Sequence, residues 1–238
     1  MSPTGSDTGR STFERCREMD APLCDRLGAL DEAIRETMPG LQEATDRLVA
    51  RLRESGVGAA APQVGDSMPD FLLPDPTGKL VDLDGLLAAG PVALVFHRGH
   101  WCSYCRLSVD ALAQANDAAK AAGLQIVAIV PDVQEFAEAF QADARGAIPV
   151  LCDVDNGYAA SLNLVVWIGD ELMALTRQAG IDLPRYHGND SWSLPIPAAF
   201  IVGRDRRVLA RFVDPDYRKR MPIDDMLTAA RRACTETR

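Results

Sequence analysis

The fold of this chain is decided by a short stretch in which an apolar run leads directly into two closely spaced cysteines: Val92-Ala93-Leu94-Val95-Phe96-His97-Arg98-Gly99-His100-Trp101-Cys102-Ser103-Tyr104-Cys105. The apolar run is continuous rather than alternating, which predicts a strand buried on both faces. The sequence from about residue 103 to 122 is typical of a helix, and Gly123 ends it. The two cysteines are therefore expected at the turn between a central strand and the start of a helix.

Short apolar runs alternate with helical segments on both sides of this turn. Further extended segments or strands are expected at 71–73, 80–83, 124–130, 149–151, 198–202 and 208–213, and helices at 134–144, 157–162 and 223–234. Residues 165–194 are expected to be irregular or partly helical. This order predicts an α/β fold, in which a central mixed sheet is covered by helices on both faces.

A helical segment precedes the sheet region. Residues 13–53 are predicted to be helical with a break at Pro39-Gly40, and residues 59–62 are expected to form a linker. We expect residues 1–10 to be disordered, residues 11–61 to form a helical extension, and residues 62–238 to form the main domain. The extension is expected either to pack on that domain or to pair with a second copy of the chain in a homodimer.

Length and composition exclude several classes of protein. The chain has 238 residues, of which 47% are hydrophobic and 25% charged, and it has neither a membrane-spanning apolar run nor an apolar signal core at its start. A net charge of −9 makes nucleic acid and anionic membranes poor partners. Six cysteines without an export signal are expected as reduced thiols in the cytoplasm. The excess of arginine over lysine favours a bacterial source.

The Cys-x-x-Cys pair carries the predicted chemistry. Free backbone N–H groups at a helix N-terminus stabilise a thiolate, which lowers the pKa of the first thiol. Two intervening residues bring Cys102 and Cys105 within reach of a disulfide after one helical turn. A reactive thiolate beside a second thiol suffices for reversible disulfide chemistry. No organic cofactor is needed, and the chain has no Gly-rich phosphate loop of the usual kind.

Two other interpretations of the turn stay open. The cysteines could be buried core residues, or they could form a zinc site with His97 and His100. In the second case the protein would be a zinc- or redox-sensing module without catalytic activity. Cys152 is expected to be a buried small hydrophobe. The cysteines that could act as resolving thiols in a dimer are Cys16, Cys24 and Cys234.

Residues 96–105 resemble the strand-to-helix turn of the peroxiredoxin-like proteins of the alkyl hydroperoxide reductase/thiol-specific antioxidant family, in the thioredoxin-fold superfamily. The resemblance covers about residues 64–225. It includes residues 65–71, which are similar to the family's opening G-D-x-x-P-D-F, and residues 148–153, 191–197 and 213–217. The resemblance implies a thioredoxin-like fold, thiol-dependent reduction of peroxides, and an external dithiol reductant such as a thioredoxin.

Two alignments of the turn with this superfamily disagree. In the thioredoxin alignment Cys102 is the nucleophile and Cys105 the resolving thiol. In the peroxiredoxin alignment the peroxidatic cysteine is Cys105, and the threonine, proline and arginine that normally bind and activate peroxide are replaced by Cys102, Arg98 and Pro197. The nucleophile therefore stays open. The alternative function is a protein-disulfide oxidoreductase without peroxidase activity.

The other predicted site residues flank the two thiols. Pro197 resembles the cis-proline of thioredoxin-fold oxidoreductases, which holds an extended substrate near the disulfide. Arg98 and His100 could lower the pKa of Cys102, and an arginine can also hydrogen-bond a peroxide oxygen. Tyr104 is expected to be an exposed turn aromatic. The predicted catalytic set, acting on a peroxide or a disulfide, is Cys102, Cys105, Pro197, Arg98 and Trp101, with Trp101 as a packing platform.

Overall fold

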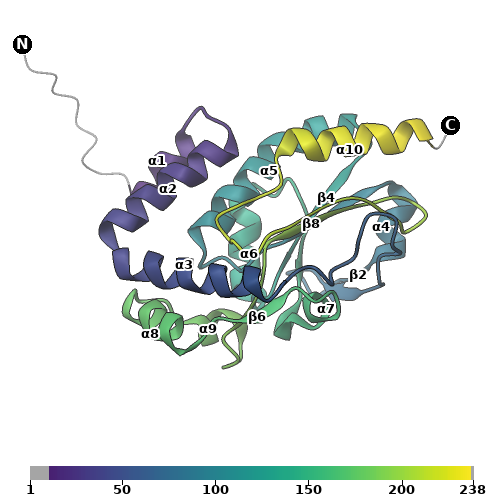
Figure 1. Ribbon diagram of the computed structural model, residues 1–238. Helices are drawn as coiled ribbons and strands as arrows, with labels where there is room; N and C mark the ends of the chain where they lie inside the picture. The colour runs from purple at the N-terminus through teal and green to yellow at the C-terminus, as the bar shows by residue number, and fades with distance from the viewer. Residues whose placement is uncertain (1–10, 237–238) are drawn as a thin grey trace, which may run out of the picture.

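The computed structural model describes residues 11–236 (Figure 1). The expected disorder of residues 1–10 lies outside the described residues, and so does the side chain of Cys234. None of the helices in the described part of the chain is long and apolar enough to cross a membrane.

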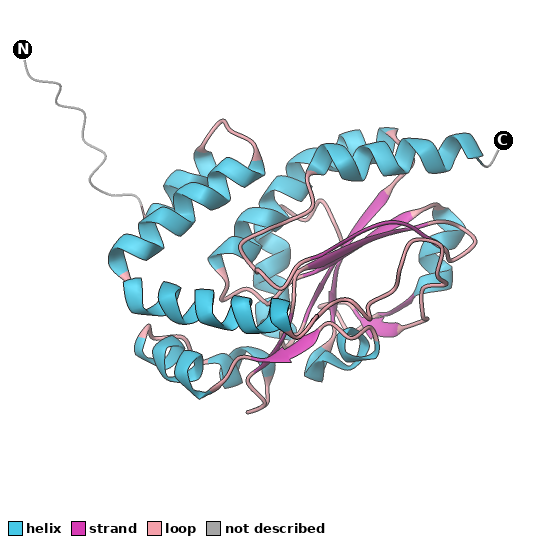
Figure 2. Ribbon diagram, in the orientation of Figure 1, coloured by secondary structure: helices cyan, strands magenta, loops and turns pink. Residues whose placement is uncertain are grey.

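A five-stranded mixed sheet in the order β5-β4-β3-β8-β9 forms the centre of the molecule (Figure 2). Strand β3 (Val92–Phe96) is parallel to β4 (Gln125–Val130), which is parallel to β5 (Val150–Cys152). On the other side, β8 (Ala198–Val202) is antiparallel to β3, and β9 (Val208–Val213) is antiparallel to β8. Every residue of β3 and β8 is buried, and for β3 this confirms the prediction from its continuous apolar run.

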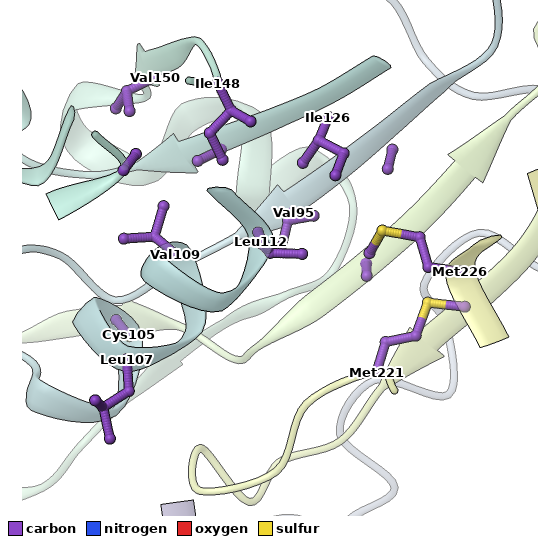
Figure 3. Packing of buried hydrophobic residues seen from close by; sticks show 14 of the residues in the cluster. Val95, Cys105, Leu107, Val109, Leu112, Ile126, Ile148, Val150, Met221 and Met226 are labelled. Carbon is purple, nitrogen blue, oxygen red and sulfur yellow. The ribbon is translucent and has the colours of Figure 1, made fainter. Parts of the chain in front are cut away.

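Helices cover both faces of this sheet because successive β3 side chains point to opposite sides. Ala93 and Val95 face α5 (Ser103–Ala121), α6 (Gln134–Asp143) and α10 (Ile223–Glu236). Figure 3 shows Val95 and Leu112 of α5 converging in this layer. The alternate β3 residues pack with α4 (Leu83–Ala89) and α7 (Gly157–Ser161). The predicted α/β fold with two covered faces is confirmed.

The N-terminal extension consists of α1 (Thr12–Glu18), α2 (Leu23–Thr37) and α3 (Pro39–Glu54). The predicted break at Pro39 is present, but the chain also breaks at residues 19–22. Pro22 is the N-cap of α2, and its extended φ and ψ angles interrupt the helical conformation between α1 and α2. Helices α1 and α2 pack on α5, and α3 packs on α8 (Asp170–Gln178) (Figure 1). The extension therefore packs on its own main domain.

Asp110 of α5 anchors this extension. Its carboxylate is fully buried and accepts hydrogen bonds from Arg26 at 3.0 Å and Arg17 at 3.2 Å, and it also binds Arg145 at 2.9 Å. Since Arg26 is itself only 3% exposed, each buried charge has its partner.

The segment between α7 and β8 is more regular than the sequence predicts. It contains α8, α9 (Leu183–His187) and an antiparallel pair of β6 (Val165–Trp167) with β7 (Ser193–Pro195). A second small antiparallel pair, β1 (Leu72–Pro74) with β2 (Leu80–Asp82), and the short turn η1 (Val154–Asn156) complete the elements. A separate apolar cluster, which includes Leu48 and Leu172, joins α3 to α8.

Candidate active site

The Cys-x-x-Cys pair lies at the turn that the sequence predicts, directly after β3. Cys102 is the N-cap of α5, and the Cys105 N–H donates to the Cys102 carbonyl at 2.9 Å. The turn needs glycine at position 99, where φ is +119° and a Cβ would collide with Asp132 Oδ1. Cys102 is 3% exposed and Cys105 is fully buried.

Two N–H donors surround the deeper thiol. The backbone N–H of Arg98 and the Nη2 of Arg220 each lie 3.3 Å from Cys105 Sγ. Arg220 belongs to the connection between β9 and α10, far from the motif in sequence. Negative charge on either sulfur is therefore close to a fixed positive charge.

The two thiols have opposite pKa shifts. Burial alone would raise the pKa of Cys102, but the hydrogen bond from Cys105 and the charges of Arg98 and Arg220 lower it to about 6. Burial, the hydrogen bond to Cys102 and the charge of the Cys102 thiolate raise the pKa of Cys105 well above its usual value. These opposite shifts favour the thiolate on Cys102 and the protonated thiol on Cys105.

Cys102 also lines a cavity of about 120 Å³. Its apolar wall is contributed by α2, α3 and the segment around α8: Ile34, Met38, Leu41, Ile168, Leu172 and Ile181. Cys105 does not belong to this wall. Of the two cysteines of the reactive turn, only Cys102 therefore adjoins the cavity.

Arg98 is the cation of this cavity. Its guanidinium stacks on the Tyr217 ring at 3.8 Å and on the Trp101 ring at 4.7 Å. Trp101 in turn donates from Nε1 to the Arg98 carbonyl at 2.9 Å. Both residues thus lie beside Cys102, where the sequence places them.

The cis-proline prediction for Pro197 is wrong. No cis peptide bond occurs among the described residues, so the Ile196–Pro197 bond is trans. The Ile196 N–H donates to the Leu164 carbonyl at 2.7 Å, so this backbone is already paired within the chain. Pro197 lines a small cavity with Arg98 and Tyr217.

His100 contacts an acidic residue, and Tyr104 differs from its expected role. His100 Nε2 lies 3.4 Å from Asp143, so its ring points to a carboxylate of α6. Tyr104 is buried rather than exposed, and its hydroxyl donates to Asp31 and accepts from Gln42 Nε2, both at 2.9 Å. These hydrogen bonds connect Tyr104 of the reactive turn to α2 through Asp31 and to α3 through Gln42.

The zinc interpretation has no support in the side-chain positions. Within residues 11–236, no three His, Cys, Asp or Glu side chains form a group that could hold a metal ion. The His97 ring is fully buried against Phe140, with 5.2 Å between ring centroids. Burial, followed by the charge of Arg220, lowers the pKa of His97 well below its usual value.

The other described cysteines are free thiols. Cys152 is buried on β5, as expected, Cys16 is buried on α1, and Cys24 is exposed on α2. Each lies on a different element from the reactive turn.

Sequence reasoning missed two charged groups near the thiols. Arg220 follows residues 213–217, which carry part of the family resemblance, but nothing in that pattern gives it a role. Asp132 follows β4, where its Oδ2 accepts the His100 N–H at 2.6 Å and its buried Oδ1 has no hydrogen-bond partner within residues 11–236. Burial raises the pKa of Asp132 to about 8, and the nearby Cys102 charge adds to this shift.

Comparisons with known proteins give the family and the fold of the chain. The model of the AhpC/TSA family matches residues 64–211. The structure is similar to peroxidoxin BcpB from Mycobacterium tuberculosis, with 22% identity and a TM-score of 0.56 over 72% of this chain and 97% of that one. It is also similar to reduced Prx3 from Vibrio vulnificus in complex with hydrogen peroxide, with 17% identity and a TM-score of 0.56 over 71% of this chain and 98% of that one.

The search of curated proteins gives no significant match. The family match nevertheless covers more than half of the chain and contains both cysteines of the reactive turn, and the solved structures share the fold. The chain therefore belongs to the AhpC/TSA family of the thioredoxin-fold superfamily and is a thiol-dependent peroxidase or oxidoreductase.

Proposed function

We propose that the protein reduces peroxides, with Cys102 as the nucleophile and Cys105 as the resolving thiol. One observation carries this assignment: of the two thiols, Cys102 lines the cavity and has its pKa lowered to about 6. A peroxide oxygen must reach the sulfur that attacks it, and Cys105 is fully buried and does not line the cavity.

In the first step the Cys102 thiolate attacks one oxygen of the peroxide and breaks the O–O bond. Cys102 is oxidised to a sulfenic acid, and the other oxygen leaves as an alkoxide or hydroxide that takes up a proton from water. Arg98, whose guanidinium lines the cavity, is placed to donate a hydrogen bond to the leaving oxygen.

In the second step the Cys105 sulfur attacks the sulfenic sulfur of Cys102. A disulfide forms, and the thiol proton leaves with the sulfenic hydroxyl as water. The N–H groups of Arg98 and Arg220 at Cys105 Sγ stabilise the negative charge that develops on this sulfur. An external dithiol, such as that of a thioredoxin, then reduces the disulfide by two electrons and two protons.

The test is to trap the sulfenic acid in single variants. Reduced protein is treated with hydrogen peroxide and dimedone, and each cysteine is mapped by mass spectrometry. In Cys105→Ser we expect a rapid, stoichiometric adduct on Cys102, whereas Cys102→Ser should give none on Cys105. Cys24→Ser is the matched control and should form the disulfide as the unaltered protein does.

Two results would contradict the proposal. A dimedone adduct on Cys105 in Cys102→Ser would reverse the roles of the two thiols. Slow oxidation of both thiols by peroxide, together with rapid reduction of insulin disulfides, would make the protein a disulfide oxidoreductase instead.

A further inference from the structure

A second and larger hollow lies on the other side of Arg220. This groove has a volume of about 820 Å³ and is lined by residues of α2 and by residues 216–224, the connection that leads from β9 to α10. Its walls are largely apolar and include Leu23, Leu27, Phe212, Met221, Pro222 and Ile223. The volume is in the range of small-molecule sites, roughly 300–1,000 Å³.

Most of the cations that line the groove are already neutralised. Arg35 pairs with Asp46 at 3.0 Å, and Arg218 pairs with both Asp46 and Asp216 at 2.7 and 2.8 Å. The exposed Lys219 lies 3.9 Å from Asp214. These side chains leave little net charge for a ligand.

Arg220 differs from these cations because no described carboxylate lies within ion-pair distance of it. Its Nη1 donates to the carbonyls of Tyr217 and Lys219, and its Nη2 donates to Cys105 Sγ. Its Nε is buried and has no hydrogen-bond partner among the described residues. The positive charge of Arg220, which lines the groove, thus has no carboxylate partner among the described residues, and the negative charge near it is that of the proposed Cys102 thiolate.

We propose that this groove binds an amphipathic carboxylate, with its carboxylate beside the Arg220 guanidinium and its alkyl chain between α2 and residues 221–223. A charged head group satisfies the unbalanced cation. An alkyl chain removes the apolar walls from water, which a small anion alone would not do. A neutral lipid would leave the charge of Arg220 unmatched.

The same cation joins the groove to the thiols. A carboxylate beside Arg220 competes with the Cys102 thiolate for its charge, so ligand binding and thiolate formation oppose each other by the same factor. This coupling rests on the proposed thiolate at Cys102, whereas binding in the groove does not. The ligand would therefore slow the reaction of Cys102 at neutral pH without entering its cavity.

Binding is measured by calorimetric titration of the reduced full chain with decanoate below its critical micelle concentration. We expect a single site, with decanol and acetate binding at least about tenfold more weakly, since one ion pair or a buried alkyl chain is worth about that factor. Arg220→Gln should reduce the affinity for decanoate to that for decanol.

Gly28 offers a variant that fills the groove without disturbing the fold. It lies on α2 in the groove wall, and a Cβ there meets no atom within 4 Å. Gly28→Phe should therefore abolish decanoate binding. Gly40→Phe is the matched control, because Gly40 lies in α3 with equal free space and does not line the groove.

The outcomes separate the site from the chemistry. Absence of decanoate binding to the folded protein, or binding that survives both Gly28→Phe and Arg220→Gln, would overturn the site. Cys102→Ser should bind decanoate more tightly than the reduced protein, and decanoate should slow the alkylation of Cys102. Equal affinities and an unchanged alkylation rate would overturn the coupling, whatever the dimedone experiment shows about peroxide reduction.

Discussion

The Nη2 of Arg220 lies 3.3 Å from the Sγ of Cys105, although 115 residues separate them in the sequence. The contact places a fixed positive charge beside two buried thiols. It also links these thiols to the segment between β9 and α10. It also makes the acidity of the dithiol testable by a change far from the Cys-x-x-Cys motif.

Removal of this charge should make Cys102 less acidic. In Arg220→Met we expect the pKa of Cys102 to rise by roughly one unit from its value of about 6, because an opposite charge at this range favours the thiolate. At pH 6 the thiolate fraction would then fall from about one half to about one tenth. The measurement is the pH dependence of alkylation by iodoacetamide. Arg207→Met, at an exposed arginine, should leave the midpoint unchanged, and an unchanged midpoint in Arg220→Met would disprove the effect.

The hydrogen bond between the two thiols should contribute separately. Cys105→Ala removes the donor to Cys102 and should move the alkylation midpoint of Cys102 above about 6. Cys105→Ser keeps a hydroxyl donor at this position and should shift the midpoint less. If both variants titrate as the unaltered protein does, the hydrogen bond does not lower the pKa of Cys102.

The buried carboxylate of Asp110 should contribute strongly to the stability with which the N-terminal extension packs on the main domain. Asp110→Asn leaves the buried Arg26 without its partner and should lower the free energy of unfolding by about 3–5 kcal/mol. Urea denaturation measures this loss, and hydrogen exchange should show earlier opening of α1 and α2. The matched control is Arg47→Ala, which breaks the exposed pair with Glu171 and should cost less than about 1 kcal/mol. Equal losses in the two variants would contradict the assignment.

Asp132 should make the stability depend on pH. Its pKa is raised from 3.8 to about 8 by burial, so the folded protein holds the proton more strongly than the unfolded chain. This contribution to stability is complete below about pH 4 and is lost as the pH rises toward about 8. Asp132→Asn should remove that loss, so the free energy of unfolding at pH 8 should come closer to its value at pH 4 than in the unaltered protein. Urea denaturation at both pH values measures this difference. Asp117→Asn, at an exposed position, should not alter the pH profile. A profile unchanged by Asp132→Asn would refute the prediction.

The central strands could be predicted because several consecutive apolar residues indicate a strand that is buried on both faces. Strands β3 and β8 are covered on both faces and appear as unbroken apolar runs, and β4 is apolar and buried after its first residue, Gln125. The turn before α5 follows from the strand, Gly99 and the helical pattern after Ser103. The position of Cys102 at the helix N-terminus was thus available from local sequence.

The remainder of the site depends on contacts between distant segments. Nothing near Arg220 indicates a thiol partner, and nothing near Tyr104 indicates that Asp31 and Gln42 bury its hydroxyl. Strands β6 and β7 have three residues each, too few for an alternating pattern to be distinguished. The cis-proline expectation for Pro197 failed because it came from the superfamily, whereas here Ile196 is paired with the β6 region.

The reactive centre of this protein is modular. The family segment, residues 64–211, contains both thiols, but Ile34, Leu41 and Tyr217 of the cavity wall and the Arg220 cation lie outside it. Part of what adjusts the thiol chemistry thus lies outside the family segment, although Arg98 lies within it. Exchange of residues 11–61 or 212–222 with those of another protein of this fold would alter access to the sulfur and its acidity without a change in either cysteine.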